Sequence, residues 1–212
     1  MSRPLLISDC DEVLLYMVVP FAEWLDEAHD VHFDVDTLFD PVTGGYLNAM
    51  RCKLTGDPLE QERVLPFLRG FFETEMHRQK PIDGAVSAIN NLRAHADVVV
   101  LPNLTDDVRD ARAEQLRVLG IDVPVYTNQG GKGELLAQIV AKFQPSVTVF
   151  VDDLAHQHIS VAKEVPDVIR LHMVGEPRVA AQIKTPRAAH ARIDRWHDAE
   201  QWIMDRFEGV PL

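Results

Sequence analysis

The chain has 212 residues, of which 46% are hydrophobic and 25% are charged. These proportions are typical of a globular protein with a substantial core, and the length suits one large domain or one domain with a smaller insert. The net charge of −12 and the pI of about 5.1 disfavour nucleic acid and anionic lipid as partners, because both would be repelled.

The first predicted element is a short apolar strand at residues 5–8, followed at once by the acids Asp9, Asp11 and Glu12. The apolar run at 13–22 is about half as long as a membrane span requires, and the N-terminus lacks a signal-peptide pattern. The two cysteines, Cys10 and Cys52, are too few for a disulfide framework. These features favour a cytoplasmic protein.

The next part of the chain is expected to be rich in helix. A helix is predicted at 14–29, and a second at 59–77, which Pro66 should kink or split. Residues 30–57 show no clear period and are interpreted as short helices and loops. Four aromatic residues are expected to form the core of this block: Trp24, Phe67, Phe71 and Phe72.

From residue 83 onward, helices and strands alternate. Helices are predicted at 83–95, 106–119, 132–143, 155–165 and 198–207, and strands at 97–101, 123–126, 147–151, 168–173 and, at an edge, 191–196. This alternation predicts an α/β fold with a doubly wound parallel sheet covered on both faces. The helical block interrupts the alternation, so we expect a core domain from 1–15 and 80–212 and a small helical cap from 16–79.

Polar side chains follow three of the predicted strands. Asp9 and Asp11 follow the first, Asn103 and Thr105 the second, and Asp152-Asp153 the one at 147–151. Lys132 precedes a predicted helix. Because ligands bind at the carboxyl ends of parallel strands, we expect these groups to converge.

A cluster of carboxylates raises the pKa of each member unless a cation is present. Mg²⁺ takes oxygen ligands and leaves positions for phosphate oxygens. A carboxylate can also act as a nucleophile and form an aspartyl-phosphate, while a second carboxylate transfers the proton. The pattern therefore favours magnesium-dependent phosphoryl chemistry.

These motifs resemble the haloacid dehalogenase-like (HAD) hydrolase superfamily: D-x-D-x-V-L after an apolar strand, a lysine before a helix, and an apolar strand that ends in D-D. The resemblance extends over nearly the whole chain, with 16–79 in the place of the superfamily's helical cap of the first type. It implies a Rossmann-like core and a Mg²⁺-dependent phosphatase that acts on a small phosphorylated molecule. The sequence leaves open whether the chain is a monomer or a homodimer.

The resemblance also implies roles for individual residues. Asp9 matches the nucleophile that binds Mg²⁺, and Asp11 the general acid/base whose backbone carbonyl binds the metal. Lys132 matches the lysine that holds the nucleophile and phosphate charges. Asp153 matches the direct metal ligand, and Asp152 a supporting carboxylate.

One position departs from the family pattern. Pro102 occupies the place of the Ser or Thr whose hydroxyl binds phosphate, which leaves Asn103 and Thr105 as candidate donors. Gln157 stands where the family often has Asp or Asn. In the insert, candidate specificity residues are Tyr46, Asn48, Arg51 and Lys53.

Two alternative functions stay open. Phosphomutase chemistry is compatible with the same motifs, and Pro102 is compatible with a weakly active or inactive relative that binds a ligand. Dehalogenation is disfavoured, because the dehalogenases resemble a pattern without the second acid, whereas Asp11 is present here.

Overall fold

The computed structural model describes residues 2–38 and 49–212. They divide into two compact units. The core unit contains the described residues of 2–15, 81–175 and 185–212, and the insert unit contains those of 16–38, 49–80 and 176–184.

The centre of the core unit is a five-stranded parallel sheet in the order β4-β1-β5-β6-β7. β1 lies between β4 and β5, with Ile7 opposite Val99 on one side and Phe150 on the other. The five strands are β1 (Leu5–Ser8), β4 (Asp97–Val100), β5 (Thr148–Asp152), β6 (Ile169–His172) and β7 (Ala191–Arg192). The predicted α/β fold with a parallel sheet is thus confirmed.

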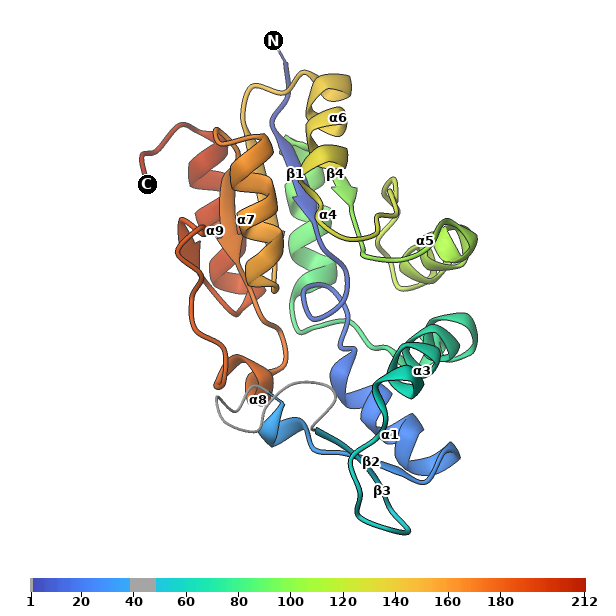
Figure 1. The fold of residues 1–212 in the computed structure, drawn as a ribbon. Coiled ribbons are helices and arrows are strands. Elements are labelled where there is room, and N and C mark those ends of the chain that lie inside the picture. Colours follow the sequence, from blue (N-terminus) through green and yellow to red (C-terminus); the bar gives the residue numbers. More distant parts are fainter. Residues whose placement is uncertain (1, 39–48) are drawn as a thin grey trace. The chain divides into compact units, whose positions relative to one another are not determined.

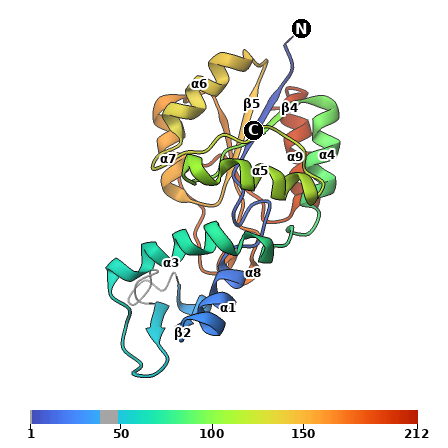
Figure 2. The ribbon, with the colours of Figure 1, turned by 90° about the vertical axis from the view of Figure 1, so that its right-hand side faces the viewer.

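Helices cover both faces of this sheet. Figure 2 shows α6 (Gly133–Phe143) and α7 (Ala155–Glu164) on one side, and α4 (Ala85–His95) and α9 (Trp196–Phe207) on the other. Every residue of β1 and β5 is buried, which explains why apolar residues predominate in both strands. Leu136 and Ile139 of α6 and Val161 of α7 belong to the hydrophobic cluster that includes these strands.

Two predicted strands differ from the structure. At 123–126, only Val125 forms an isolated parallel bridge with Val100, because Pro124 has no N–H to extend a ladder. The predicted edge strand 191–196 ends at Arg192, since Trp196 begins α9 and its buried indole N–H donates to the Val13 carbonyl at 2.7 Å.

Helix α5 (Arg109–Val118) follows the short helix η3 (Asp106–Val108), within the predicted range of 106–119. Its buried positions include Arg112 and Leu116, and Val108 of η3 is also buried. Because residues four apart share a helix face, Arg112 lies on the buried face, between two apolar residues.

The insert unit combines helices with a small antiparallel sheet of β2 (Val31–Phe33) and β3 (Met50–Cys52), drawn side by side in Figure 1. The interpretation of 30–57 as helices and loops is therefore wrong at these two strands, because three-residue strands show too little alternation to detect. The helical elements are α1 (Val18–Ala28), η1 (Val35–Thr37), α3 (Gln61–Thr74), η2 (Met76–Arg78) and α8 (Pro177–Ala180).

Aromatic side chains pack the interior of the insert unit. The ring centroid of Phe71 lies 5.4 Å from that of Phe21 and 5.8 Å from that of Trp24. Phe67 lies 6.3 Å from Trp24, and Phe72 5.8 Å from Phe71. All four aromatic residues predicted for this core therefore take part in ring contacts, but only Trp24 and Phe71 are buried, while Phe67 and Phe72 are half-buried.

Two further predictions about the insert need correction. Pro66 lies inside α3 and does not split it, although its ring nitrogen has no N–H for a helical hydrogen bond. Residues 176–184, predicted to belong to the core domain, lie in the insert unit instead. There the Gln182 side chain donates to the Val35 carbonyl at 2.8 Å, a contact between residues too distant in sequence to predict.

Candidate active site

Asp9 and Asp152 lie at the same edge of the sheet because their strands are parallel neighbours. Asp9 directly follows β1, and its N–H donates to the Val151 carbonyl at 2.8 Å. Asp152 is the last residue of β5. Both side chains are almost completely buried.

Lys132 joins these two acids. Its Nζ atom lies 2.8 Å from Asp9 Oδ1 and 2.7 Å from Asp152 Oδ2, and its side chain is fully buried. Asp9 Oδ1 also accepts the Cys10 N–H at 2.7 Å. One buried ammonium therefore links two carboxylates that are far apart in sequence.

The turn that carries Lys132 is fixed by Gln157. The Gln157 side chain accepts the Lys132 N–H at 2.8 Å and donates to the Gly130 carbonyl at 2.9 Å. Gly133 follows Lys132, and a Cβ at Gly133 would lie 2.4 Å from the Ser160 carbonyl oxygen of α7. Only a glycine at position 133 lets α6 and α7 approach so closely. The packing of these two helices therefore accounts for the glycine that follows Lys132.

Burial dominates the acid–base properties of the cluster. It raises the pKa of Asp9 to about 7, against the attraction of Lys132 and with further contributions from Asp152 and Asp11. The pKa of Asp153 is raised well above its ordinary value by burial and by the charges of Asp152, Asp9 and Glu12. Burial lowers the pKa of Lys132, but its two carboxylate partners more than offset this and leave it above its ordinary value.

The buried acids fit a divalent metal ion. Asp9, Asp152 and Asp153 each place a carboxylate oxygen within 4.8 Å of the others. The oxygens of Asp152 bind Lys132 and the Leu154 N–H, whereas no residue in the described ranges donates a hydrogen bond to the Asp153 carboxylate. A buried carboxylate without donors is neutralised either by a proton or by a cation, and Asp153 and the second oxygen of Asp9 are the expected ligands if a metal binds, with Asp152 in support.

Two buried histidines hold the backbone of this acidic turn. His158 Nε2 lies 2.9 Å from the Asp152 carbonyl oxygen, and His172 Nε2 lies 2.8 Å from that of Asp153. Since a carbonyl can only accept, we assign the proton to Nε2 in both rings. Burial lowers the pKa of both histidines, which favours the neutral form.

The second acid of the D-x-D pair is held by a residue that the sequence analysis missed. Arg112 Nη2 lies 3.0 Å from Asp11 Oδ1 and 3.3 Å from Asp11 Oδ2. The Arg112 side chain is fully buried, and that of Asp11 is 20% exposed. The signal was present in the sequence, because Arg112 lies four residues from both Val108 and Leu116 on one helical face.

The candidate phosphate donors after β4, Asn103 and Thr105, are exposed, in contrast to the buried acids. The exposed Asn103 side chain donates to the Gly130 carbonyl at 3.1 Å and accepts from Asn128 at 2.9 Å. Thr105 is the exposed N-cap residue of η3. Pro102 is buried, and its carbonyl accepts the Asn128 N–H at 3.1 Å.

The specificity candidates of the insert are only partly described. Tyr46 and Asn48 lie outside the described residues. Arg51 donates to the Gly56 carbonyl at 3.3 Å, and Lys53 forms an ion pair with Asp26 at 2.7 Å. Both cations have partners within the insert unit.

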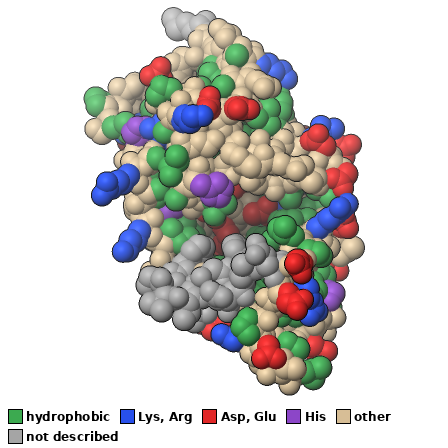
Figure 3. Space-filling view, in the orientation of Figure 1, with side chains coloured by type: hydrophobic (Ala, Val, Ile, Leu, Met, Phe, Trp, Pro, Cys, Tyr) green, Lys and Arg blue, Asp and Glu red, His purple; other side chains and the backbone are tan. Residues whose placement is uncertain are grey.

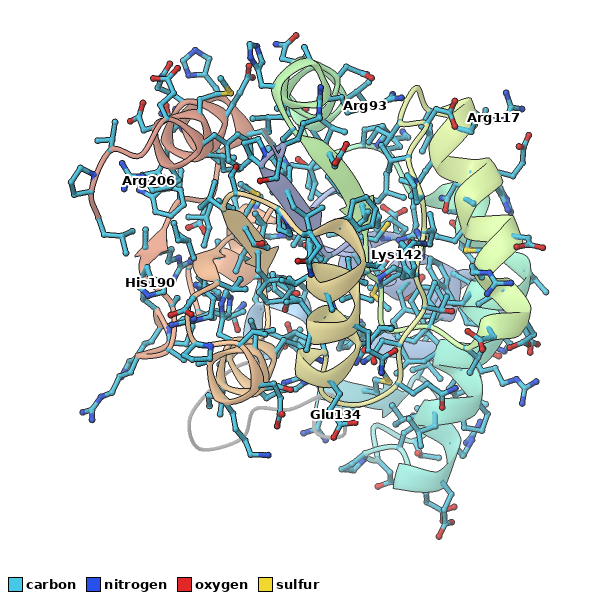
Figure 4. All side chains as sticks on the ribbon, turned by 90° about the horizontal axis from the view of Figure 1, so that it is seen from above. Arg93, Arg117, Glu134, Lys142, His190 and Arg206 are labelled. Carbon is cyan, nitrogen blue, oxygen red and sulfur yellow. The ribbon has the colours of Figure 1, made fainter. Side chains whose placement is uncertain are left out.

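The surface cations contrast with those of the site. On the face shown in Figure 3, Lys and Arg side chains are scattered among acidic and hydrophobic ones rather than gathered in one patch. In Figure 4, Arg93 on α4 and Arg117 on α5 lie at the periphery, and both are exposed. Positive charge beside the buried acids comes instead from the two buried side chains, Lys132 and Arg112.

Sequence comparison and structural comparison differ in outcome. No family model matches the sequence, and no curated protein matches it. The structure, in contrast, matches solved structures over nearly its full length. The chain has the fold of the HAD-like hydrolases.

Three of these structures illustrate the likeness. YfnB from Bacillus subtilis, bound to magnesium, has a TM-score of 0.66 at 14% identity and covers 96% of this chain and 99% of its own. The HAD-like family protein SP0104 from Streptococcus pneumoniae has a TM-score of 0.64 at 9% identity, covering 95% and 98%. A predicted phosphoglycolate phosphatase from Haemophilus somnus 129pt has a TM-score of 0.61 at 12% identity, covering 94% and 97%.

No helix in the described ranges is long and apolar enough to cross a membrane.

Proposed function

We propose that this chain is a Mg²⁺-dependent phosphatase of small phosphorylated molecules, acting through a phospho-Asp9 intermediate. The observation that carries the proposal is the buried Asp9–Lys132–Asp152 chain beside Asp153, whose carboxylate lacks a donor among the described residues. The fold of the HAD-like hydrolases and the magnesium-bound state of the similar YfnB support it.

Each residue has a defined part in the proposed reaction. Asp9 forms a bond to phosphorus while the bond from phosphorus to the leaving oxygen breaks, and Asp11 gives its proton to that oxygen. Water then attacks the phosphorus and yields a proton to Asp11, and the bond to Asp9 breaks, which releases phosphate. Lys132 fixes Asp9 and offsets charge, and Asn103 and Thr105 are the proposed phosphate donors.

Magnesium would be held by Asp9, Asp153 and the Asp11 backbone carbonyl, with Asp152 in support. When bound, the ion offsets the charge of the transferring phosphoryl group. Lys132 alone cannot do so, because Asp9 and Asp152 already share it.

The test is the hydrolysis of p-nitrophenyl phosphate and a panel of phosphorylated metabolites by Asp9→Asn. Loss of the nucleophile should lower kcat/KM by at least roughly 10³-fold while the fold is kept. Asp122→Asn, an exposed acid of the core unit, is the matched control and should retain full activity. A phosphoryl adduct on the peptide that contains Asp9, detected by mass spectrometry after acid quench, would identify the intermediate.

One observation favours a second function, a ligand-binding relative with little turnover. Pro102 stands where the family has a hydroxyl donor, and Asn103 is engaged with the 128–130 loop. In that case wild type and Asp9→Asn would share the same background rate, and beryllofluoride with Mg²⁺ would not raise the Tm of the wild type. A clear rise in Tm that Asp9→Asn abolishes would favour the phosphatase.

A further inference from the structure

Arg112 of α5 is a buried arginine whose guanidinium contacts an acid of the candidate site. Its side chain is fully buried. Nη2 lies 3.0 and 3.3 Å from the two oxygens of Asp11. Nη1 donates to Gln115 Oε1 at 3.0 Å and contacts Cys10 Sγ at 3.4 Å. All of these residues belong to the core unit.

A buried guanidinium is costly unless a charge compensates it. Asp11 compensates the charge of Arg112, because both of its carboxylate oxygens lie within 3.3 Å of Nη2. Nη2 reaches both oxygens of Asp11 while Nη1 bonds Gln115, so the planar guanidinium is itself held in place and fixes the position of the Asp11 carboxylate.

The two acids of the D-x-D pair therefore contact two different buried cations. Asp9 is bound by Lys132 at 2.8 Å, and Asp11 by Arg112 at 3.0 Å. Cys10 separates the two acids, and its Sγ faces Arg112. Lys132 lies at the start of α6 and Arg112 lies on α5, so two different helices position the two acids.

We propose that Arg112 is a positioning residue for Asp11. It holds the Asp11 carboxylate where this group gives a proton to the leaving oxygen and takes one from water. The inference rests on the proposed phosphatase function. A purely structural Arg112 would stabilise the packing of α5 and leave the proton transfer unaffected.

The experiment compares substrates that differ in their need for a proton. The p-nitrophenolate group leaves without a proton, whereas phenol and simple alcohols require one. In Arg112→Met, kcat/KM for phenyl phosphate, which reports the transfer to Asp9 and not the later attack of water, should fall roughly 10²-fold, the scale of one proton-transfer contribution, with much less loss for p-nitrophenyl phosphate.

Three further variants separate positioning from packing. Arg112→Lys keeps a cation but loses the Nη1 contacts with Gln115 and Cys10 that hold it in place, so it should show the same selectivity for the better leaving group to a smaller degree. In Asp11→Asn, adding Arg112→Met should cause no further change in that selectivity. Arg206→Met removes a similarly buried guanidinium of α9 (Figure 4), which packs over Trp202, and should alter neither rate.

The outcomes are distinct. Equal losses of kcat/KM on both substrates in Arg112→Met and in Arg112→Lys would overturn the positioning role and leave Arg112 as a packing residue. If Arg112→Met is unfolded by circular dichroism, Arg112→Lys decides the question alone. Failure of the wild type to hydrolyse any phosphate with Mg²⁺ would overturn the proposed function, and the positioning role with it.

Discussion

The two units of this protein have opposite kinds of interior. The core unit buries charged side chains at the end of its sheet, including Asp9, Lys132 and Asp152. The insert unit buries aromatic rings such as Phe21 and Phe71.

The two kinds of interior differ in what burial does to stability. Burying rings is favourable at any pH, because apolar surface leaves water. Burying carboxylates is unfavourable unless cations offset them, so such a cluster indicates a function other than stability. The core unit therefore combines a sheet that apolar strands stabilise with a charged site whose burial lowers the stability of the fold.

The largest effect is expected when the cation of the core site is removed. Lys132→Met should abolish hydrolysis and lower the free energy of unfolding by about 3–5 kcal/mol, because Asp9 and Asp152 lose their shared partner. Urea denaturation without metal measures this change. If the free energy of unfolding were unaltered, Lys132 would not be what stabilises the buried Asp9 and Asp152.

Removing a ring from the insert interior should cost about as much, through packing alone. Phe71→Ala should lower the free energy of unfolding by about 3–5 kcal/mol, because Phe71 is fully buried among other rings. Phe71→Leu is the control and should lose much less. In contrast to Lys132→Met, the loss in Phe71→Ala should be the same with and without Mg²⁺; a loss that Mg²⁺ alters would contradict this distinction.

A smaller effect, confined to the core site, is expected from pH and metal together. The pKa of Asp9 is raised from 3.8 to about 7, so its contribution to stability is present at low pH and is lost as pH rises through 7. Mg²⁺ binds the ionised acid, so its stabilisation should be greater at pH 8 than at pH 5. It should reach about 2.7 kcal/mol at a hundred times Kd.

Differential scanning fluorimetry with and without Mg²⁺ at the two pH values measures this dependence. Asp153→Asn should reduce the Mg²⁺-induced rise in Tm at pH 8. A rise that is equal at pH 5 and pH 8 would show that the metal binds elsewhere.

The smallest effect is expected at the surface of the insert unit. Arg69 and Glu73 form an exposed i,i+4 ion pair at 2.6 Å. Arg69→Gln should lower Tm by less than about 2 °C, because water and salt screen such pairs. A larger loss would mean that surface charge stabilises the insert to a degree comparable with its rings.

Sequence patterns predicted the elements with strong periodicity and failed where elements are short. The strands at 97–100 and 148–152 and the helices of the core follow from apolar runs and amphipathic spacing. The three-residue strands β2 and β3 and the four-residue helix α8 escaped prediction, since so few residues establish no period.

The candidate site was predicted in part, for a similar reason. Asp9, Lys132 and Asp152 came from local motifs, and the parallel sheet brings them within hydrogen-bonding distance. Arg112 was overlooked, since a single arginine on an amphipathic helix is usually exposed to solvent. Its partner Asp11 lies 101 positions earlier in the chain.

The sequence by itself determined the alternation of strands and helices and the order of the acidic motifs, because both are local properties of the chain. Only the tertiary structure decided that Arg112 binds Asp11, because these two residues lie 101 positions apart. It also decided that Asp153 remains without a donor among the described residues while Asp152 is fully bonded. Such differences arise from burial and neighbouring charge, which depend on the packed arrangement and not on spacing along the chain.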